Sequence, residues 1–177
     1  MKRIALLALL PLAVLGTLPP AETPLPPSAG APTRLLTPLP GALRTQGFGC
    51  TSFELEPANP ECPGGHFHAG LDLAGPGPGT PVLAAAGGLV LTVVSSPGGY
   101  GLHVVLDHSH GLTTLYAHLQ RSAVAGGELV AGGQPVGGLG STGLSTGTHL
   151  HFEVRTGGRP ADPELYLSAA NFRGGTP

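Results

Sequence analysis

The chain has 177 residues, of which 30 are glycine and 20 are proline, and only 10% of its residues are charged. Beyond the first three residues it keeps six arginines, no lysine and ten acidic residues, a net charge of about −4. This balance disfavours nucleic acid and anionic membrane surfaces as partners. The length leaves room for one domain with further segments at its ends.

The N-terminus has the organisation of an export signal. Lys2 and Arg3 precede an apolar stretch over residues 4–16. Such a stretch is shorter than the roughly 20 residues that a membrane-spanning helix needs. We therefore expect residues 1–21 to be a signal peptide. No cysteine follows at a lipoprotein position, so we expect a protein of the periplasm, cell envelope or extracellular space that is not held at the membrane after cleavage.

A proline-rich segment follows the expected signal. Eight of the twenty prolines lie between Leu18 and Pro40, which predicts an extended tether over residues 22–41. We expect the folded domain over residues 42–168 and a C-terminal tail over 169–177. Within the domain the glycines separate short apolar runs, a pattern typical of tight turns between strands.

The two cysteines, Cys50 and Cys62, stand at the start of the expected domain. In an exported protein this spacing favours a disulfide that closes a surface loop. A rival interpretation is a structural zinc site, because His66 and His68 complete a C-x11-C-x3-H-x-H series. The series lacks the closely spaced cysteine pair of such sites, and an oxidising compartment favours the bridge, so we expect the disulfide.

Five β-type runs make up most of the remaining domain. They are bounded by GG, PGG, SHG and GSTG, which are sequences of tight turns. Beyond the signal segment no window of ten residues has a clear 3.6-residue apolar period, so we expect little helix. The sequence predicts an all-β domain, a mostly antiparallel folded-over sheet or sandwich. The runs are TPVLAAA (80–86), GLVLTVVS (88–95), YGLHVVLD (100–107), LTTLYAHL (112–119) and THLHFEV (148–154).

Three groups of residues could carry chemistry. They are His68 with Asp72 in HAGLD, His118 in LYAH, and His149 with His151 in HLH. A catalytic zinc ion takes three protein ligands, typically imidazole nitrogens and carboxylate oxygens, and keeps one position for water. Taken singly, each histidine fits an ordinary surface or hydrogen-bonded residue, but the groups together favour a metal site.

Strand geometry leaves the division of labour open. His149 and His151 would lie on one strand face about 6.6 Å apart, so both could bind one metal, or one could bind it while the other faces substrate. His68 and Asp72 would be about 13 Å apart along a straight strand. They can converge only if the chain bends, and Gly70 between them permits a bend.

Three strings resemble the lysostaphin-type (LytM-like) peptidoglycan metallopeptidases. They are HAGLDLAGPGPGTPVLAAAGGLV, GGYGLHVVLDHSHGLTTLYAHL and VAGGELVAGGQPVGGLGSTGLSTGTHLHFEV. The likeness covers about residues 44–167, and the motifs H-x-G-x-D, Y-A-H and H-L-H-F-E occur in the family's order. It implies the duplicated-hybrid-motif fold of that family, an antiparallel β structure with an active-site groove and zinc on the groove floor.

The resemblance also implies a role for each motif residue. His68, Asp72 and His151 match the ligands of one Zn²⁺ per chain. His118 and His149 match the family's two unligated histidines, which face substrate in the cleft and are the expected catalytic residues. Such imidazoles orient or deprotonate the attacking water and stabilise developing charge. Which of the two acts as the base stays open.

Five further positions are less clear. Glu153 continues the strand face of the HLH pair, and we favour an ordinary structural role for it over a contact with a metal ligand. His66 falls outside the phase of H-x-G-x-D. His103, His108 and His110 have no motif position and are expected at the surface.

We compare three functions. An exported zinc endopeptidase that hydrolyses peptide cross-links of bacterial peptidoglycan is favoured, because all five motif positions are filled. The alternative is a non-catalytic module of the same fold that binds the wall or activates an amidase, for which loss of a ligand would be the mark. A metallopeptidase acting on other glycine-rich proteins is the weakest. We expect a monomer, and the bond cut, a glycyl bridge or a D-alanyl to diamino-acid link, is not decided by the sequence.

Overall fold

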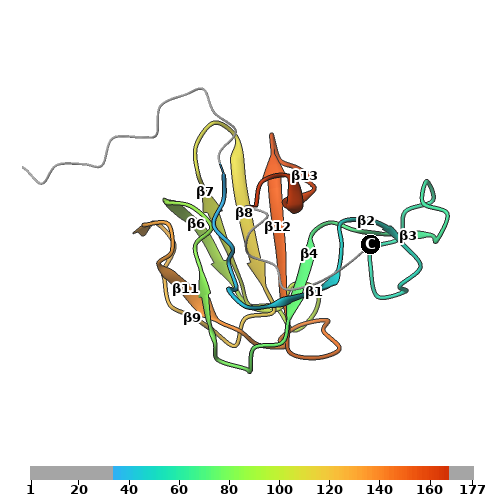
Figure 1. Cartoon of the computed structure of the whole chain (residues 1–177), viewed down its shortest axis with the longest axis horizontal. Helices are drawn as coiled ribbons and strands as arrows, with labels where there is room; N and C mark the ends of the chain where they lie inside the picture. The colour runs from blue at the N-terminus through green and yellow to red at the C-terminus, as the bar shows by residue number, and fades with distance from the viewer. Residues whose placement is uncertain (1–33, 168–177) are drawn as a thin grey trace, which may run out of the picture. The chain divides into compact units, whose positions relative to one another are not determined.

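Thirteen short β-strands provide nearly all the regular structure of residues 34–167, the part of the chain that the computed structural model describes (Figure 1). Within these residues the helical structure is one 3-10 turn, η1 (Pro163–Leu165), and no helix is long and apolar enough to cross a membrane. The prediction of an all-β domain with little helix is confirmed. The expected signal peptide and C-terminal tail lie outside the described residues.

The strands form three sheets in which all neighbours are antiparallel. The largest has the order β1-β4-β12-β8-β7-β6-β10, with β13 also paired to β12. Its strands are β1 (Leu43–Gln46), β4 (Leu71–Ala74), β6 (Gly88–Val94), β7 (His103–Asp107), β8 (Leu112–Ala117), β10 (Leu129–Val130), β12 (Leu150–Thr156) and β13 (Arg159–Ala161). The smaller sheets contain β5 (Pro81–Leu83), β11 (Pro135–Gly138) and β9 (Arg121–Ser122), and β2 (Gly49–Thr51) with β3 (His66–His68).

One buried cluster joins the large sheet to the three-stranded sheet. On β7 the buried residues alternate with less buried ones, so Val104 and Leu106 face inward. Val82 of β5 and Val136 of β11 belong to the same cluster. Each sheet thus covers the apolar face of the other, which is how antiparallel sheets remove apolar surface from water. The predicted sandwich-like packing is present.

The core extends before residue 42, where the sequence analysis placed the start of the folded domain. Leu35 and Leu39 are fully buried. Leu35 forms a parallel bridge with Leu167, and the Leu36 N–H donates to the Ala85 carbonyl. Apolar residues between the last prolines of the expected tether therefore pack on the domain.

β12 occupies the middle of the large sheet and is buried on both faces. Figure 1 shows it in orange between β8 in yellow and β4 in green. Leu150, Phe152 and Val154 belong to the core, and Phe152 packs against Tyr116 with ring centroids 5.4 Å apart. The intervening residues therefore point to the opposite face, where the two histidines of the HLH motif lie.

His108 departs from the expected surface position. It is buried, its Nδ1–H donates to the Gly87 carbonyl at 2.9 Å, and its Nε2 lies 2.7 Å from the Thr114 hydroxyl. Burial lowers the pKa of His108, which favours the neutral ring. The prediction is wrong for His108 because the neighbouring strands enclose it, whereas His110 is exposed and His103 half-buried.

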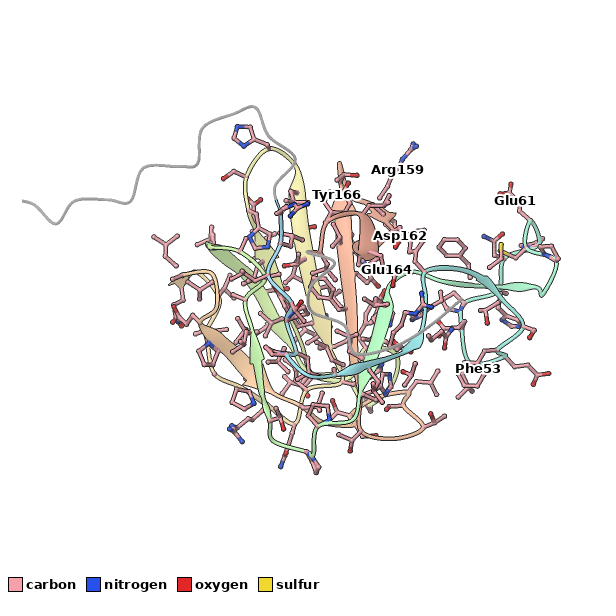
Figure 2. The ribbon with its side chains drawn as sticks, in the orientation of Figure 1. Phe53, Glu61, Arg159, Asp162, Glu164 and Tyr166 are labelled. Carbon is pink, nitrogen blue, oxygen red and sulfur yellow. A yellow bond between two sulfur atoms is a disulfide. The ribbon has the colours of Figure 1, made fainter. Side chains whose placement is uncertain are left out.

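Cys50 and Cys62 form a disulfide, as the sequence predicted, and the rival zinc site that used both thiols is excluded. The disulfide closes the loop between β2 and β3. Figure 2 shows Phe53 and Glu61 on this loop, to the side of the large sheet. We call residues 52–57 the disulfide-loop wall.

Candidate metal centre

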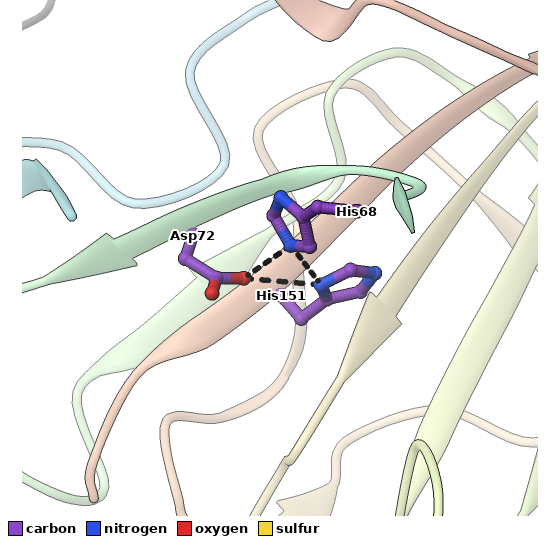
Figure 3. A group of neighbouring side chains, drawn as sticks. All are labelled: His68, Asp72 and His151. Atoms are coloured by element: carbon purple, nitrogen blue, oxygen red, sulfur yellow. Dashed lines mark hydrogen bonds and ion pairs between the residues drawn. The ribbon is translucent and has the colours of Figure 1, made fainter. Parts of the chain in front are cut away.

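Three side chains that the sequence assigned to a metal converge where β3, β4 and β12 meet. Figure 3 shows His68, Asp72 and His151 pointing toward one another. His68 Nε2 lies 3.2 Å from Asp72 Oδ1 and 3.0 Å from His151 Nδ1, and these last two atoms are 3.0 Å apart. All three residues are buried. Asp72 and His151 are also register partners of β4 and β12.

A bend at Gly70 brings His68 back to Asp72. β3 and β4 belong to different sheets, and Ala69 and Gly70 form the break between them. A Cβ on Gly70 would lie 2.5 Å from the backbone oxygen of Phe152. Only glycine allows the chain to turn this closely against β12, so the bend that the sequence analysis required is made at the residue that permits it.

The partners of the two imidazoles decide which nitrogens are available to a cation. His68 Nδ1 lies 2.8 Å from the Gly47 carbonyl, which can only accept, so this nitrogen carries the hydrogen. His151 Nε2 lies 3.1 Å from Glu153 Oε1 and donates to it for the same reason. In neutral rings the other two nitrogens, His68 Nε2 and His151 Nδ1, then carry lone pairs that face each other and Asp72. Three electron-pair donors at this spacing fit a cation, and two nitrogens with one carboxylate oxygen are a typical zinc set.

Glu153 contacts His151 directly, although the sequence analysis favoured an ordinary structural role for it. Its carboxylate is fully buried and also accepts from the Tyr100 hydroxyl at 2.5 Å and from Arg155 Nε at 2.6 Å. Burial alone would raise the pKa of Glu153, but the hydrogen bonds from His151 and Arg155 lower it to about 2. Glu153 is therefore an anion that fixes the tautomer and orientation of His151, an arrangement common behind metal-binding histidines.

The charges of the three side chains are strongly coupled. Burial acts to raise the pKa of Asp72, but hydrogen bonds from His151 and His68 bring it well below its usual range. Burial acts to lower the pKa of His151, and its hydrogen bonds to Asp72 and Glu153 more than offset this, giving about 9. Without a metal, a proton on His151 thus supplies the positive charge between the Asp72 and Glu153 carboxylates.

His118 and His149 lie beside this group, with their ring centroids 4.7 Å apart. His118 follows β8 in a left-handed conformation, φ 61°, which is uncommon outside glycine and typical of functional positions. Its Nδ1–H donates to the Thr142 carbonyl at 2.8 Å. His149 Nδ1–H donates to the Gly147 carbonyl at 2.9 Å, and its Nε2 lies 3.8 Å from Asp72 Oδ2.

The pKa of His118 is lowered to about 4, chiefly by burial; the neighbouring His149 and His151 act in the same direction, and the hydrogen bond to the Thr142 carbonyl opposes it. The ring is therefore neutral near pH 7. Since Nδ1 carries the hydrogen, Nε2 holds a lone pair that can accept a proton.

A groove of about 670 Å³ runs over these side chains. It is lined by β1, by the disulfide-loop wall, by segment 144–148 and by Tyr100. His118, His149, His151 and Asp72 also line it. The five predicted site residues are thus brought together at one groove, either on its surface or, for His68, directly beneath it.

Tyr100, Thr142 and Glu56 were not predicted as site residues from the sequence. Tyr100 supports Glu153, and its ring lies 5.6 Å from that of His151. The Thr142 carbonyl accepts from His118, and the Thr142 hydroxyl accepts from the Leu102 N–H and donates to the Leu119 carbonyl. The available signals were an aromatic residue at the start of YGLHVVLD, which was interpreted only as a strand, and a threonine inside GSTG, which was interpreted only as a turn. His66 contributes no ligand, since its Nδ1–H donates to the Glu56 carbonyl.

The sequence of this domain is similar to those of known peptidases. The sequence pattern of "Peptidase family M23" matches residues 66–163. The chain is 50% identical over 97 residues to the DD-carboxypeptidase/endopeptidase Mpg of Neisseria meningitidis, covering 55% of this chain and 22% of Mpg. It is 41% identical over 95 residues to the peptidoglycan DD-endopeptidase ShyB of Vibrio cholerae, covering 54% of this chain and 22% of ShyB. The chain thus spans about a fifth of the length of these relatives.

Two solved structures resemble the fold. A zinc-containing peptidase from Vibrio cholerae superposes with a TM-score of 0.59 and 34% identity, over 73% of this chain and 39% of that chain. The catalytic domain of lysostaphin from Staphylococcus simulans superposes with a TM-score of 0.58 and 31% identity, over 71% of this chain and 91% of that chain. The lysostaphin-type fold expected from the sequence is confirmed.

Proposed function

The chain belongs to peptidase family M23, and on this basis we propose that it is an exported zinc metallopeptidase that hydrolyses peptide bonds in the cross-links of bacterial peptidoglycan. The observation that carries the proposal is the convergence of three buried ligand atoms, from His68, Asp72 and His151, within 3.2 Å of one another beside two further imidazoles. The activities named for Mpg and ShyB support a cell-wall peptide as substrate.

His68, Asp72 and His151 would hold one zinc ion per chain. Zinc supplies a Lewis acid for the scissile carbonyl and makes water acidic enough to attack near neutral pH. The remaining steps belong to the protein. His118 is a neutral base whose Nε2 can accept the water proton and then return it to the leaving amine, while the Thr142 carbonyl holds its Nδ1–H. His149 lies beside it in the groove, with the two ring centroids 4.7 Å apart.

Isolated sacculi provide the test. The purified protein, loaded with zinc, is incubated with sacculi, and released muropeptides are analysed by mass spectrometry. We expect peptide cleavage that stops when a chelator is added and returns with zinc. A non-catalytic module of the same fold would instead bind sacculi and release nothing in either condition. The masses of the products identify the bond that is cut.

We predict that zinc binding becomes tighter as the pH rises. Because His151 is protonated up to a pKa of about 9 in the metal-free protein, zinc must displace that proton. The apparent affinity should rise about tenfold per pH unit below this pKa. Competition against a calibrated chelator from about pH 6 to 9 measures it.

Glu153→Gln serves as the matched variant in that titration. The substitution removes one of the hydrogen-bonded anions that raise the pKa of His151, so the affinity should level off at a lower pH. It should also be weaker at its plateau, by about 10- to 100-fold, as for other lost partners of metal-binding histidines. An affinity that does not vary over this range in the unmodified protein would contradict the assignment of His151.

A further inference from the structure

Glu56 is a groove carboxylate that the proposed mechanism does not use. It lines the groove from the disulfide-loop wall, and its Oε1 lies 3.9 Å from His68 Nε2. Among residues 34–167 the group that could share one metal consists of His68, Asp72 and His151, and Glu56 is not part of it. Since His68 uses its other nitrogen to bind Gly47, Glu56 also does not support that ring from behind.

Glu56 and the catalytic histidines occupy opposite sides of the metal group. In the large sheet β1 pairs with β4, whereas β8 pairs with β12. Gln46 of β1 donates to Glu56 Oε1 at 3.2 Å, and His118 directly follows β8. A peptide lying across the groove would therefore meet Glu56 on one side of its scissile bond and the two imidazoles on the other.

The loop holds Glu56 in place before any substrate arrives. The Glu56 N–H donates to the Phe53 carbonyl at 3.0 Å, and the Glu56 carbonyl accepts from His66 Nδ1 at 2.7 Å. The disulfide closes the same loop. Among the described residues the second carboxylate oxygen, Oε2, has no hydrogen-bond partner, and it is not sealed from solvent. A preorganised carboxylate of this kind binds a cation at little entropic cost.

The surroundings of Glu56 narrow the kind of cation. None of the described residues that line the groove is a lysine or an arginine, so neither type of cationic side chain competes there for the carboxylate. Phe53 and Leu55 line the same wall and are 42% and 43% exposed. The apolar surface of Phe53 and Leu55 next to the Glu56 anion suits an aliphatic stem that ends in an ammonium group, and it offers little to a glycine residue.

We propose that Glu56 and Gln46, with Phe53 and Leu55 beside them, form a subsite for a substrate side chain that ends in a primary ammonium, such as a diamino acid with one free amine. The inference rests on the proposed function, since it presupposes a peptide in the groove. Such a subsite favours cross-links whose peptides carry a free amine over bridges made of glycine alone.

Chemically modified substrates test the subsite. Zinc-loaded protein is given cross-linked muropeptide dimers with free diamino-acid amines, the same dimers after reductive dimethylation, which keeps the charge, and after N-acetylation, which removes it. We expect KM to rise about 10-fold or more on acetylation and little on dimethylation, as for a lost charge-assisted hydrogen bond. Glu56→Gln should process all three with the higher KM, at unchanged kcat and unchanged zinc content.

Glu54→Gln is the matched control, because Glu54 is exposed on the same loop and does not line the groove. It should discriminate like the unmodified protein. Equal KM values for charged and acetylated dimers in the unmodified protein would overturn the subsite, and so would a fall of kcat or zinc content in Glu56→Gln. If no dimer is cleaved, the proposed function fails, and the subsite is then tested by measuring equilibrium binding of the three dimers. Preferential binding of charged dimers that Glu56→Gln abolishes supports it, and equal binding of all three overturns it.

Discussion

Replacement of His151 by alanine is expected to abolish zinc binding and peptide hydrolysis together. The imidazole contributes one of three converging ligand atoms and is the residue that links them to the buried Glu153 anion. Its loss should weaken zinc binding by more than the roughly 10- to 100-fold that follows loss of a ligand's hydrogen-bond partner. Metal analysis after gel filtration, with muropeptide release from sacculi, measures both effects.

Two further variants separate loss of the site from loss of the fold. Asp72→Asn keeps the shape of the side chain but removes the charge that faces both imidazoles, so it should lose zinc and activity as His151→Ala does. His110→Ala alters an exposed histidine far from any motif position and should keep both. Far-ultraviolet circular dichroism confirms that the variants are folded. A folded His151→Ala protein that retains stoichiometric zinc would refute the ligand set.

Replacement of His149 by alanine is expected to give a different result, in which zinc remains near one ion per chain and turnover falls. His149 Nε2 is 3.8 Å from the nearer Asp72 oxygen and outside the triad of short contacts. Its ring lies against His118 in the groove, where it can act on substrate or on the transferred proton. General acid–base groups contribute about 10²- to 10⁴-fold to rate, so kcat should fall within this range. Steady-state kinetics on a defined muropeptide dimer, with metal content determined on the same sample, provides the measurement.

The metal content of His149→Ala is the decisive value. If the variant loses zinc, His149 is a ligand, and the division of the HLH pair into one ligand and one groove residue is mistaken. His103→Ala is a suitable comparison, since His103 is half-buried on β7 and has no place among the predicted site residues. It should keep both zinc and turnover.

The sequence predicted the central strands well because their residues alternate. In 148–154 the apolar residues at 150, 152 and 154 form the core face, and the histidines occupy the other face. The strands before residue 80 were not predicted because each has only three or four residues. Several contain glycine or polar side chains, so an alternating pattern cannot develop. Their pairing depends on partners far along the chain, such as β12 for β4.

The site shows the same division between local and long-range information. Motif spacing brings out His68, Asp72 and His151. The tautomers that make the two imidazoles suitable for a cation, however, depend on the Gly47 carbonyl for His68 and on Glu153 for His151. Glu56 had no signal in the sequence, because it lies in an irregular loop whose path is fixed by a disulfide and by β3. A chemically plausible residue in such a loop can be recognised only after the chain has been traced in space.

The central position of β12 has a consequence for the order in which the protein can assemble. β12 lies between β4 and β8, both of which precede it in the chain. Until residues 150–156 take their place, the sheet lacks this interior strand, and β4 and β8 each present an open edge that invites wrong pairing. His68 and His151 are 83 residues apart, so the peptidase centre cannot form on an incomplete chain. Formation of the centre is therefore tied to completion of the sheet, and a fragment ending before β12 should be inactive and prone to aggregate.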